Sequence, residues 1–206
     1  LWGGQGAKSR SDGKDQLRSD DPEVYVKMAE EALTEKRYAT AAHHVNTALE
    51  LQPEHSQAWL LKGKIEEADG HSEQAVNAYH RAISCNETHP EATLRLARIQ
   101  IEHGRSAHTA QVLRSLIECP QTTAEQKSQA QWMLGVAYVR MGRWTPAVQS
   151  LVAGAQDRNL SADDRYLLAM ARYKSGDIAG ARRDVEQQLQ IQPSHAQFAS
   201  LLAELN

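Results

Sequence analysis

The sequence repeats with a period of 34 residues, and this period constrains the fold more than any other feature. Five windows align along the chain at spacings of 34, 34, 38 and 34 residues, and a sixth, shorter window follows them. The windows begin at Pro22, Ser56, Pro90, Ser128, Ala162 and Ala196. A period of this length is typical of arrays in which one supersecondary unit stacks on the next. The sequence therefore predicts a solenoid over residues 22–206.

Small and large residues occupy fixed columns of the repeat, which we number from the first residue of each window. Columns 8 and 20 carry small residues that let two antiparallel helices approach closely, and column 24 carries a large apolar residue that fills the space beside them. Column 8 holds Ala29, Gly63, Ala97, Gly135 and Ala169, column 20 holds Ala41, Ala75, Thr109, Ala147 and Ala181, and column 24 holds Val45, Tyr79, Leu113, Leu151 and Val185. Each full window therefore predicts a pair of packed helices.

The ends of the two helices are marked by their own columns. Column 15 holds Lys36, Gly70, Gly104, Gly142 and Gly176. Glycine at this column predicts that the first helix ends in a left-handed cap. Pro53 and Pro193, at column 32, predict the end of the second helix. A helical hairpin of this kind cannot bury its apolar face alone, so neighbouring hairpins must stack.

The column pattern resembles that of the tetratricopeptide repeat family, which is W-x2-L-G-x2-Y, then A-x3-F, then P. The segments AWLLKGKIEEADGHSEQAVNAY (58–79) and WMLGVAYVRMGRWTPAVQSL (132–151) follow it most closely. The resemblance implies an all-α fold, a right-handed α-solenoid of about five helical hairpins with a final helix over 194–205.

The third window departs furthest from the family pattern. Thr93, Gln100 and Gln121 stand at its columns 4, 11 and 32, and Lys62 replaces a leucine at column 7 of the second window. Four extra residues near 121–127 predict a longer turn or an additional helical turn before the fourth window.

Residues 1–21, LWGGQGAKSRSDGKDQLRSDD, differ in kind from the repeats. They are rich in Gly, Ser, Asp and Lys and show no periodicity, so they predict a flexible tether. Because the chain begins at Leu1 rather than at Met, we expect either a processed product or a segment cut from a longer chain, and any targeting signal would have lain upstream.

Charge and composition argue against several classes of function. A net charge of −3 gives no basic excess to drive nucleic-acid binding. No apolar run approaches the roughly 18 residues that span a bilayer, so we expect no membrane insertion by this chain. The nine histidines lack metal-site spacing, and Cys85 and Cys119 are expected to be free thiols. We therefore expect no metal, no cofactor and no catalysis.

The family resemblance implies that a partner binds the concave face, formed by the first helix of each hairpin at columns 2, 5, 9, 12 and 13. The candidate groove residues are Leu60, Leu94, Arg98, Trp132, Val136, Val139, Tyr166, Met170 and Tyr173. The last six are predicted to form one apolar patch. Within QWMLGVAYVRMG (131–142), Trp132, Val136 and Val139 recur at i, i+4 and i+7 and so form a second apolar stripe.

Two other interpretations of this stripe stay open. Superhelical curvature can bury column 5 against neighbouring helices, in which case Leu60, Leu94 and Trp132 belong to the core. The groove can also be filled by Leu1 and Trp2 of a neighbouring copy.

These features predict a protein-interaction scaffold that holds a partner segment in its groove. The clamp with which related repeats hold the acidic C terminus of a chaperone is absent. Its places are taken by Val26, Glu30, Leu61, Glu91 and Arg95, and only Arg95 fits.

The tether and the size of the array resemble those of bacterial envelope lipoproteins that help the secretin rings of type IV or Tad (Flp) pili to assemble. This resemblance implies a secretin or pilus component as partner, a lipid anchor upstream of Leu1, and a periplasmic location at the outer membrane. The alternative is a cytosolic adaptor, or a regulatory domain of a larger protein.

Overall fold

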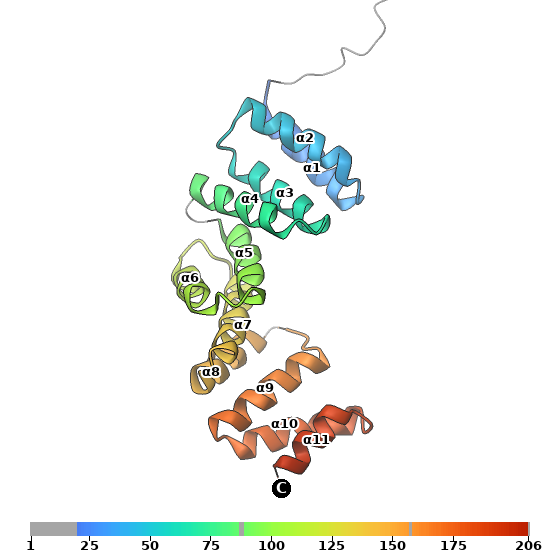
Figure 1. Ribbon diagram of the computed structural model, residues 1–206, viewed down its shortest axis with the longest axis vertical. Helices are drawn as coiled ribbons and strands as arrows, with labels where there is room; N and C mark the ends of the chain where they lie inside the picture. Colours follow the sequence, from blue (N-terminus) through green and yellow to red (C-terminus); the bar gives the residue numbers. More distant parts are fainter. Residues whose placement is uncertain (1–19, 87–88, 157, 206) are drawn as a thin grey trace, which may run out of the picture.

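The computed structural model describes residues 20–86, 89–156 and 158–205, and within these ranges the chain is built of α-helices and turns. The helices are α1 (Pro22–Thr34), α2 (Tyr38–Leu51), α3 (Ser56–Ala68), α4 (Ser72–Cys85), α5 (Pro90–Glu102), α6 (Ser106–Glu118), α7 (Ala124–Arg140), α8 (Trp144–Ala155), α9 (Ala162–Ser175), α10 (Ile178–Ile191) and α11 (Ala196–Glu204). Figure 1 shows an elongated stack with α1 near one end and α11 at the other. The predicted all-α solenoid is confirmed. Of the predicted tether, residues 1–19 lie outside the described residues.

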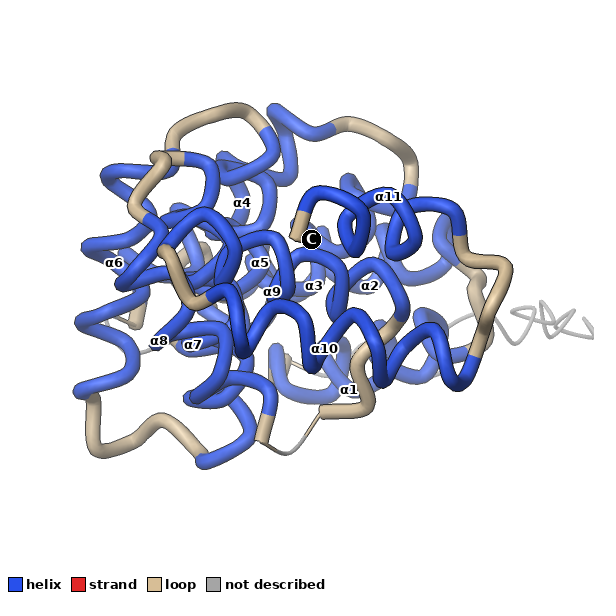
Figure 2. Tube along the Cα trace, turned by 90° about the horizontal axis from the view of Figure 1, so that it is seen from below, coloured by secondary structure: helices blue, strands red, loops and turns tan. Residues whose placement is uncertain are grey.

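Successive helices pair as hairpins, and the hairpins stack in chain order. α1 packs on α2, α3 on α4 and α7 on α8, and each second helix also contacts the first helix of the next hairpin. Figure 2 looks along the stack and shows the helices joined by short loops. Five helices begin at the first residue of an aligned window, at Pro22, Ser56, Pro90, Ala162 and Ala196.

The turn inside each hairpin has the left-handed backbone that column 15 predicts. The φ angle is 58° at Lys36, 80° at Gly70, 77° at Gly104, 68° at Gly142 and 90° at Gly176. The next residue donates its N–H to the carbonyl five positions earlier, as from Asp177 to Arg172 at 2.9 Å. This hydrogen bond satisfies a carbonyl that the helix end leaves free, so the predicted cap is confirmed.

The fourth hairpin starts one helical turn before its aligned window. α7 begins at Ala124 instead of Ser128 and has 17 residues. A capping box fixes this start, because Thr123 Oγ1 accepts from Gln126 N at 3.2 Å and Thr123 N donates to Gln126 Oε1 at 3.0 Å. The extra residues of the sequence therefore form an additional helical turn.

The two helices of a hairpin touch where column 8 faces column 24. A Cβ atom added to Gly63 would lie 2.3 Å from Cε1 of Tyr79, and one added to Gly135 would lie 2.6 Å from Cγ of Leu151. Both large side chains are fully buried. The predicted packing of small residues beside large ones is therefore confirmed.

Gly154 lies where α8 crosses close to the backbone of α7. A Cβ atom there would lie 2.4 Å from Trp132 N and 2.9 Å from Ser128 O. Alanine is favoured over glycine by about 1 kcal/mol in a helix. Because the obstructing atoms are backbone, we still expect Gly154→Ala to lower the free energy of unfolding by about 1–3 kcal/mol in chemical denaturation.

A comparison with Gly142→Ala separates crowding from backbone strain. Nothing lies within 4 Å of a Cβ atom on Gly142, but its φ is positive. Gly142→Ala should lower the free energy of unfolding by about 1–2 kcal/mol, because alanine is strained in the left-handed backbone. If Gly154→Ala instead stabilised the protein, the close approach of α7 and α8 would be wrong.

Candidate functional site

The column 5 residues of the candidate groove lie in the core. Leu60 is 0%, Leu94 4% and Trp132 5% exposed. Leu60 packs in a cluster with Ala92 and Leu96 of α5, the first helix of the next hairpin. The prediction that these three residues line an open groove is wrong, and the alternative that column 5 is core is right. The reason is that the next hairpin covers this face of each first helix.

Trp132 shows how that burial arises. Its side chain belongs to a cluster with Leu151 of α8 and with Leu168 and Ala171 of α9. The guanidinium carbon of Arg158 lies 5.1 Å from the centre of its ring. The indole is therefore enclosed by the fourth and fifth hairpins and cannot contact a partner.

The predicted apolar patch is divided between clusters. Val136 and Val139 are partly buried and pack against the clusters that contain Leu134 and Trp132. The three candidates on α9, which are Tyr166, Met170 and Tyr173, pack instead against the cluster of α9, α10 and α11. Trp132 is therefore removed from the predicted patch, whereas the other five residues, which pack on separate core clusters, each keep part of their surface exposed.

The aromatic contact between α9 and α11 is specific in geometry. The rings of Tyr166 and Phe198 meet edge to face, with centroids 5.4 Å apart and planes at 85°. Phe198 is fully buried, whereas Tyr166, Met170 and Tyr173 each keep part of their surface exposed. These three side chains therefore stabilise the end of the stack and still present atoms to solvent.

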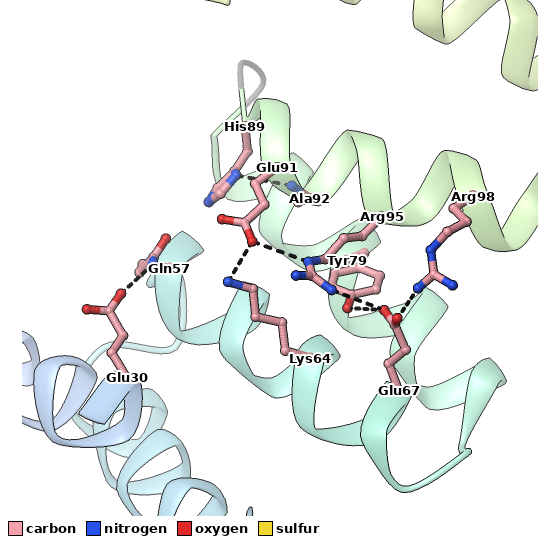
Figure 3. Close-up of polar contacts among 10 residues, drawn as sticks. All are labelled: Glu30, Gln57, Lys64, Glu67, Tyr79, His89, Glu91, Ala92, Arg95 and Arg98. Atoms are coloured by element: carbon pink, nitrogen blue, oxygen red, sulfur yellow. Dashed lines mark hydrogen bonds and ion pairs between the residues drawn. The ribbon is translucent and has the colours of Figure 1, made fainter. Parts of the chain in front are cut away.

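A charged cluster bridges α3 and α5, and we call it the inner ionic network. It consists of Lys64 and Glu67 on α3 and of Glu91, Arg95, Arg98 and Glu102 on α5. Figure 3 shows most of these side chains pointing toward one another across the interval between the two helices. Direct backbone packing joins α1 to α3 and α5 to α7. Between α3 and α5, long charged side chains span much of the distance.

Glu91 and Glu67 are the centres of the inner ionic network. Glu91 Oε1 lies 2.6 Å from Lys64 Nζ and 3.2 Å from Arg95 Nε. Glu67 pairs with Arg98, and its Oε2 lies 3.6 Å from Arg95 Nη1. Each guanidinium or ammonium of the network therefore has a carboxylate beside it.

The Tyr79 hydroxyl of α4 connects the inner ionic network to the core by a hydrogen bond. It donates to Glu67 Oε2 at 2.7 Å. Burial and this hydrogen bond raise the pKa of Tyr79 well above its ordinary value. The phenol therefore stays protonated and holds Glu67 in place for its arginine partners.

The balance of charges decides what this surface can bind. The three cations of the network are paired with its three carboxylates. The network therefore offers no set of unpaired positive groups that could bind an acidic peptide. Arg95, which alone matched the chaperone clamp, is engaged by Glu91 and Glu67. Arg98, whose side chain is 48% exposed, is the most accessible cation of the network.

The inner ionic network predicts a modest acid sensitivity. Burial alone would raise the pKa of Glu91, but Lys64 and Arg95 outweigh it and hold that pKa below its ordinary value. A carboxylate with a lowered pKa in the folded state stabilises the protein above pH 4.5, and this contribution is lost as the pH falls further. Because Glu91 is 41% exposed, we expect its ion pairs to contribute less than about 1 kcal/mol to the free energy of unfolding.

Urea denaturation of the parent and Glu91→Gln proteins measures this contribution. The parent should be the more stable at pH 7, and the difference should shrink below pH 4. Glu50→Gln, on an exposed position of α2, is the control and should show no such convergence. A difference that stays constant from pH 7 to pH 3 would contradict the ion pairs of Glu91.

The described residues offer little for metal or redox chemistry. Within them, no group of three or more His, Cys, Asp or Glu side chains could hold a metal ion. Cys85 and Cys119 are free thiols, as predicted. None of the helices that the structure describes combines the length and the hydropathy that crossing a bilayer requires.

The repeat period, the stacked hairpins and an inner face of ion pairs and partly exposed apolar groups define an α-solenoid of the kind that binds other proteins. A tetratricopeptide repeat model matches residues 26–71 and 132–196, which is more than half of the chain. The chain therefore belongs to the tetratricopeptide repeat family. No curated protein sequence matches it.

Solved structures share this fold at low sequence identity. YrrB, a tetratricopeptide repeat protein with an unusual peptide-binding site, is 15% identical with a TM-score of 0.74, over 88% of this chain and 92% of its own. PilF of Pseudomonas aeruginosa is 14% identical with a TM-score of 0.68, and the match covers 89% of this chain and 97% of PilF. PilW, a widely conserved type IV pilus biogenesis factor, is 16% identical with a TM-score of 0.61, and the match covers 88% of this chain and 98% of PilW. These similarities establish the fold alone.

Proposed function

We propose that this chain is a scaffold that holds a partner segment along the inner face of α5, α7 and α9. The observation that carries the proposal is the alignment of column 9. Arg98, Val136 and Met170 occupy this column on successive first helices, and all three are at least partly exposed. A segment lying along the stack would meet them in order, with Val139, Tyr166 and Tyr173 beside it.

The chemistry of this row defines the segment that it would take. Val136, Val139, Met170 and the two tyrosines offer apolar and aromatic surface, which supplies anchors for apolar side chains. Arg98 offers a partly exposed guanidinium at the other end of the row. We therefore expect a segment whose apolar side chains lie on α7 and α9 and whose polar end lies near α5.

We further propose that the partner is a secretin or another component of a pilus assembly in the bacterial envelope. The similarity in fold to PilF and PilW supports this choice, as does the polar tether predicted for residues 1–21. The protein would then lie in the periplasm, held at the outer membrane by a lipid anchor upstream of Leu1.

Co-purification with the pilus secretin of the source cell tests this function. Tagged parent protein, solubilised from the envelope in mild detergent, should recover the secretin. Tyr173→Ser should reduce the recovery at least tenfold, whereas Glu186→Lys, on an exposed position of α10, should leave it unchanged. Circular dichroism checks that both variants are folded.

The outcomes distinguish the two parts of the proposal. If the parent protein recovers no secretin or pilus component, the pilus assignment is wrong. If Tyr173→Ser recovers as much secretin as the parent does, the partner binds elsewhere and the inner face is not the site.

A further inference from the structure

The third hairpin contains a cavity of about 410 Å³ between α4, α5 and α6. Its floor is apolar and includes Ile83, Leu96, Val112 and Leu116. A volume in this range and an apolar lining with a few polar groups are typical of sites for small molecules.

The cavity arises because Thr93 stands at column 4 of this repeat. In the second repeat, column 4 is Trp59, whose indole nitrogen donates to the carbonyl of Pro53 at 2.7 Å. Arg81, at column 26, lies 5.8 Å from the centre of that ring. In the third repeat the corresponding residues are Thr93 and Ser115, and both line the cavity. The cavity therefore takes the place that an aromatic side chain occupies in the preceding repeat.

The polar groups of the cavity favour an anion. His80 of α4, His108 of α6 and Gln100 of α5 line it, and none of its described lining residues is Asp or Glu. Gln100 Oε1 already accepts from Thr109 Oγ1 at 3.1 Å, which leaves its amide N–H groups to donate to a ligand. Burial lowers the pKa of His80, and the nearby His108 and Arg105 lower it further, so that at neutral pH this imidazole is uncharged and offers a carboxylate an N–H donor.

The cavity is separate from the inner face of α5, which carries the inner ionic network. Thr93, Ala97 and Gln100 follow Glu91, Arg95 and Arg98 by two positions each along α5. At about 100° per residue, two positions place them roughly opposite on the helix. The ionic network and the cavity therefore lie on opposite faces of α5, and a ligand in the cavity would not compete with a partner on the inner face.

We propose that this cavity binds a small aromatic carboxylate, with its ring in place of a column 4 side chain and its carboxylate toward His80, His108 and Gln100. The proposal does not depend on the function proposed for the inner face, because the two sites share no side chain.

Indole-3-acetate is the probe that tests the site, and calorimetry with the full chain measures its affinity. Indole, which lacks the anion, and tryptamine, which carries a cation, are the comparison ligands. We expect indole-3-acetate to bind at least tenfold more tightly than tryptamine. His108→Gln should weaken indole-3-acetate several-fold and leave the binding of indole unchanged.

Filling the cavity should abolish binding. Thr93→Trp places an indole where the ligand ring would lie, so its affinity for indole-3-acetate should fall at least tenfold. Thr145→Trp, at an exposed position of α8, introduces the same side chain elsewhere and should bind as the parent does. If Thr93→Trp does not fold, Ser115→Trp, at the exposed edge of the cavity, provides a second block.

Three results would overturn the proposal. The first is the absence of saturable binding of indole-3-acetate to the parent protein. The second is unchanged binding in a folded Thr93→Trp or Ser115→Trp variant. The third is binding of a short peptide ending in tryptophan when free indole-3-acetate does not bind, which would assign the cavity to a protein ligand.

Discussion

Replacing Trp132 with alanine should lower the free energy of unfolding by about 3–5 kcal/mol. The indole is 5% exposed and packs against Leu151 and Leu168, so its removal leaves a cavity between the fourth and fifth hairpins. Neighbouring backbone cannot close that cavity, because α7 and α8 already meet at Gly154. Chemical denaturation followed by circular dichroism measures the loss.

Two variants on the same helix calibrate this result. Leu134→Ala removes another buried side chain of α7 and should cost about 2–5 kcal/mol. Gln129→Ala changes an exposed side chain and should cost no more than about 0.5 kcal/mol. If Trp132→Ala behaved like Gln129→Ala, Trp132 would line an open groove and the burial described here would be wrong.

Replacing Phe198 with alanine should also lower the free energy of unfolding by about 3–5 kcal/mol. This loss should affect only the hairpin and helix at the C-terminal end of the stack. Phe198 is 0% exposed, and its ring meets the rings of Tyr166 at 5.4 Å and His195 at 4.9 Å. In a solenoid each repeat contacts only its neighbours, so the loss should stay local. We expect faster amide hydrogen exchange in α9, α10 and α11.

The first two hairpins are the internal control for Phe198→Ala. Exchange in α1 to α4 should stay as it is in the parent protein, because these helices lie in the half of the stack away from α11 (Figure 1). Equal acceleration along the whole chain would contradict a stack of nearest-neighbour contacts and indicate one cooperative core.

The columns of the repeat predicted the fold well because each one encodes a local or nearest-neighbour contact. Gly142 has the left-handed backbone that a helix cap needs, and Gly135 leaves room for Leu151. These requirements recur in each hairpin, so the period itself reveals them. The additional turn at the start of α7 could be predicted only as one of two alternatives, because four inserted residues fit either a helix or a loop.

The candidate site was harder to predict, because it depends on which face each neighbouring hairpin covers. Apolar residues lie on nearly every side of α7, so periodicity could not tell whether Trp132 faces a partner or the fifth hairpin. The charges of Lys64, Glu67 and Glu91 were visible in the sequence. Their pairing was not, because it depends on the spacing between α3 and α5. Thr93 and Gln100 were visible as departures from the family pattern, but their cavity needed the structure.

The most direct test of the inner face as the working surface is photo-crosslinking in the source cell. A photoreactive residue at position 173 should capture the secretin or another pilus component. The same residue at position 186, on the exposed side of α10, should capture neither. Capture from position 186 and not from position 173, or from both equally, would contradict the account and move the binding surface to the second helices.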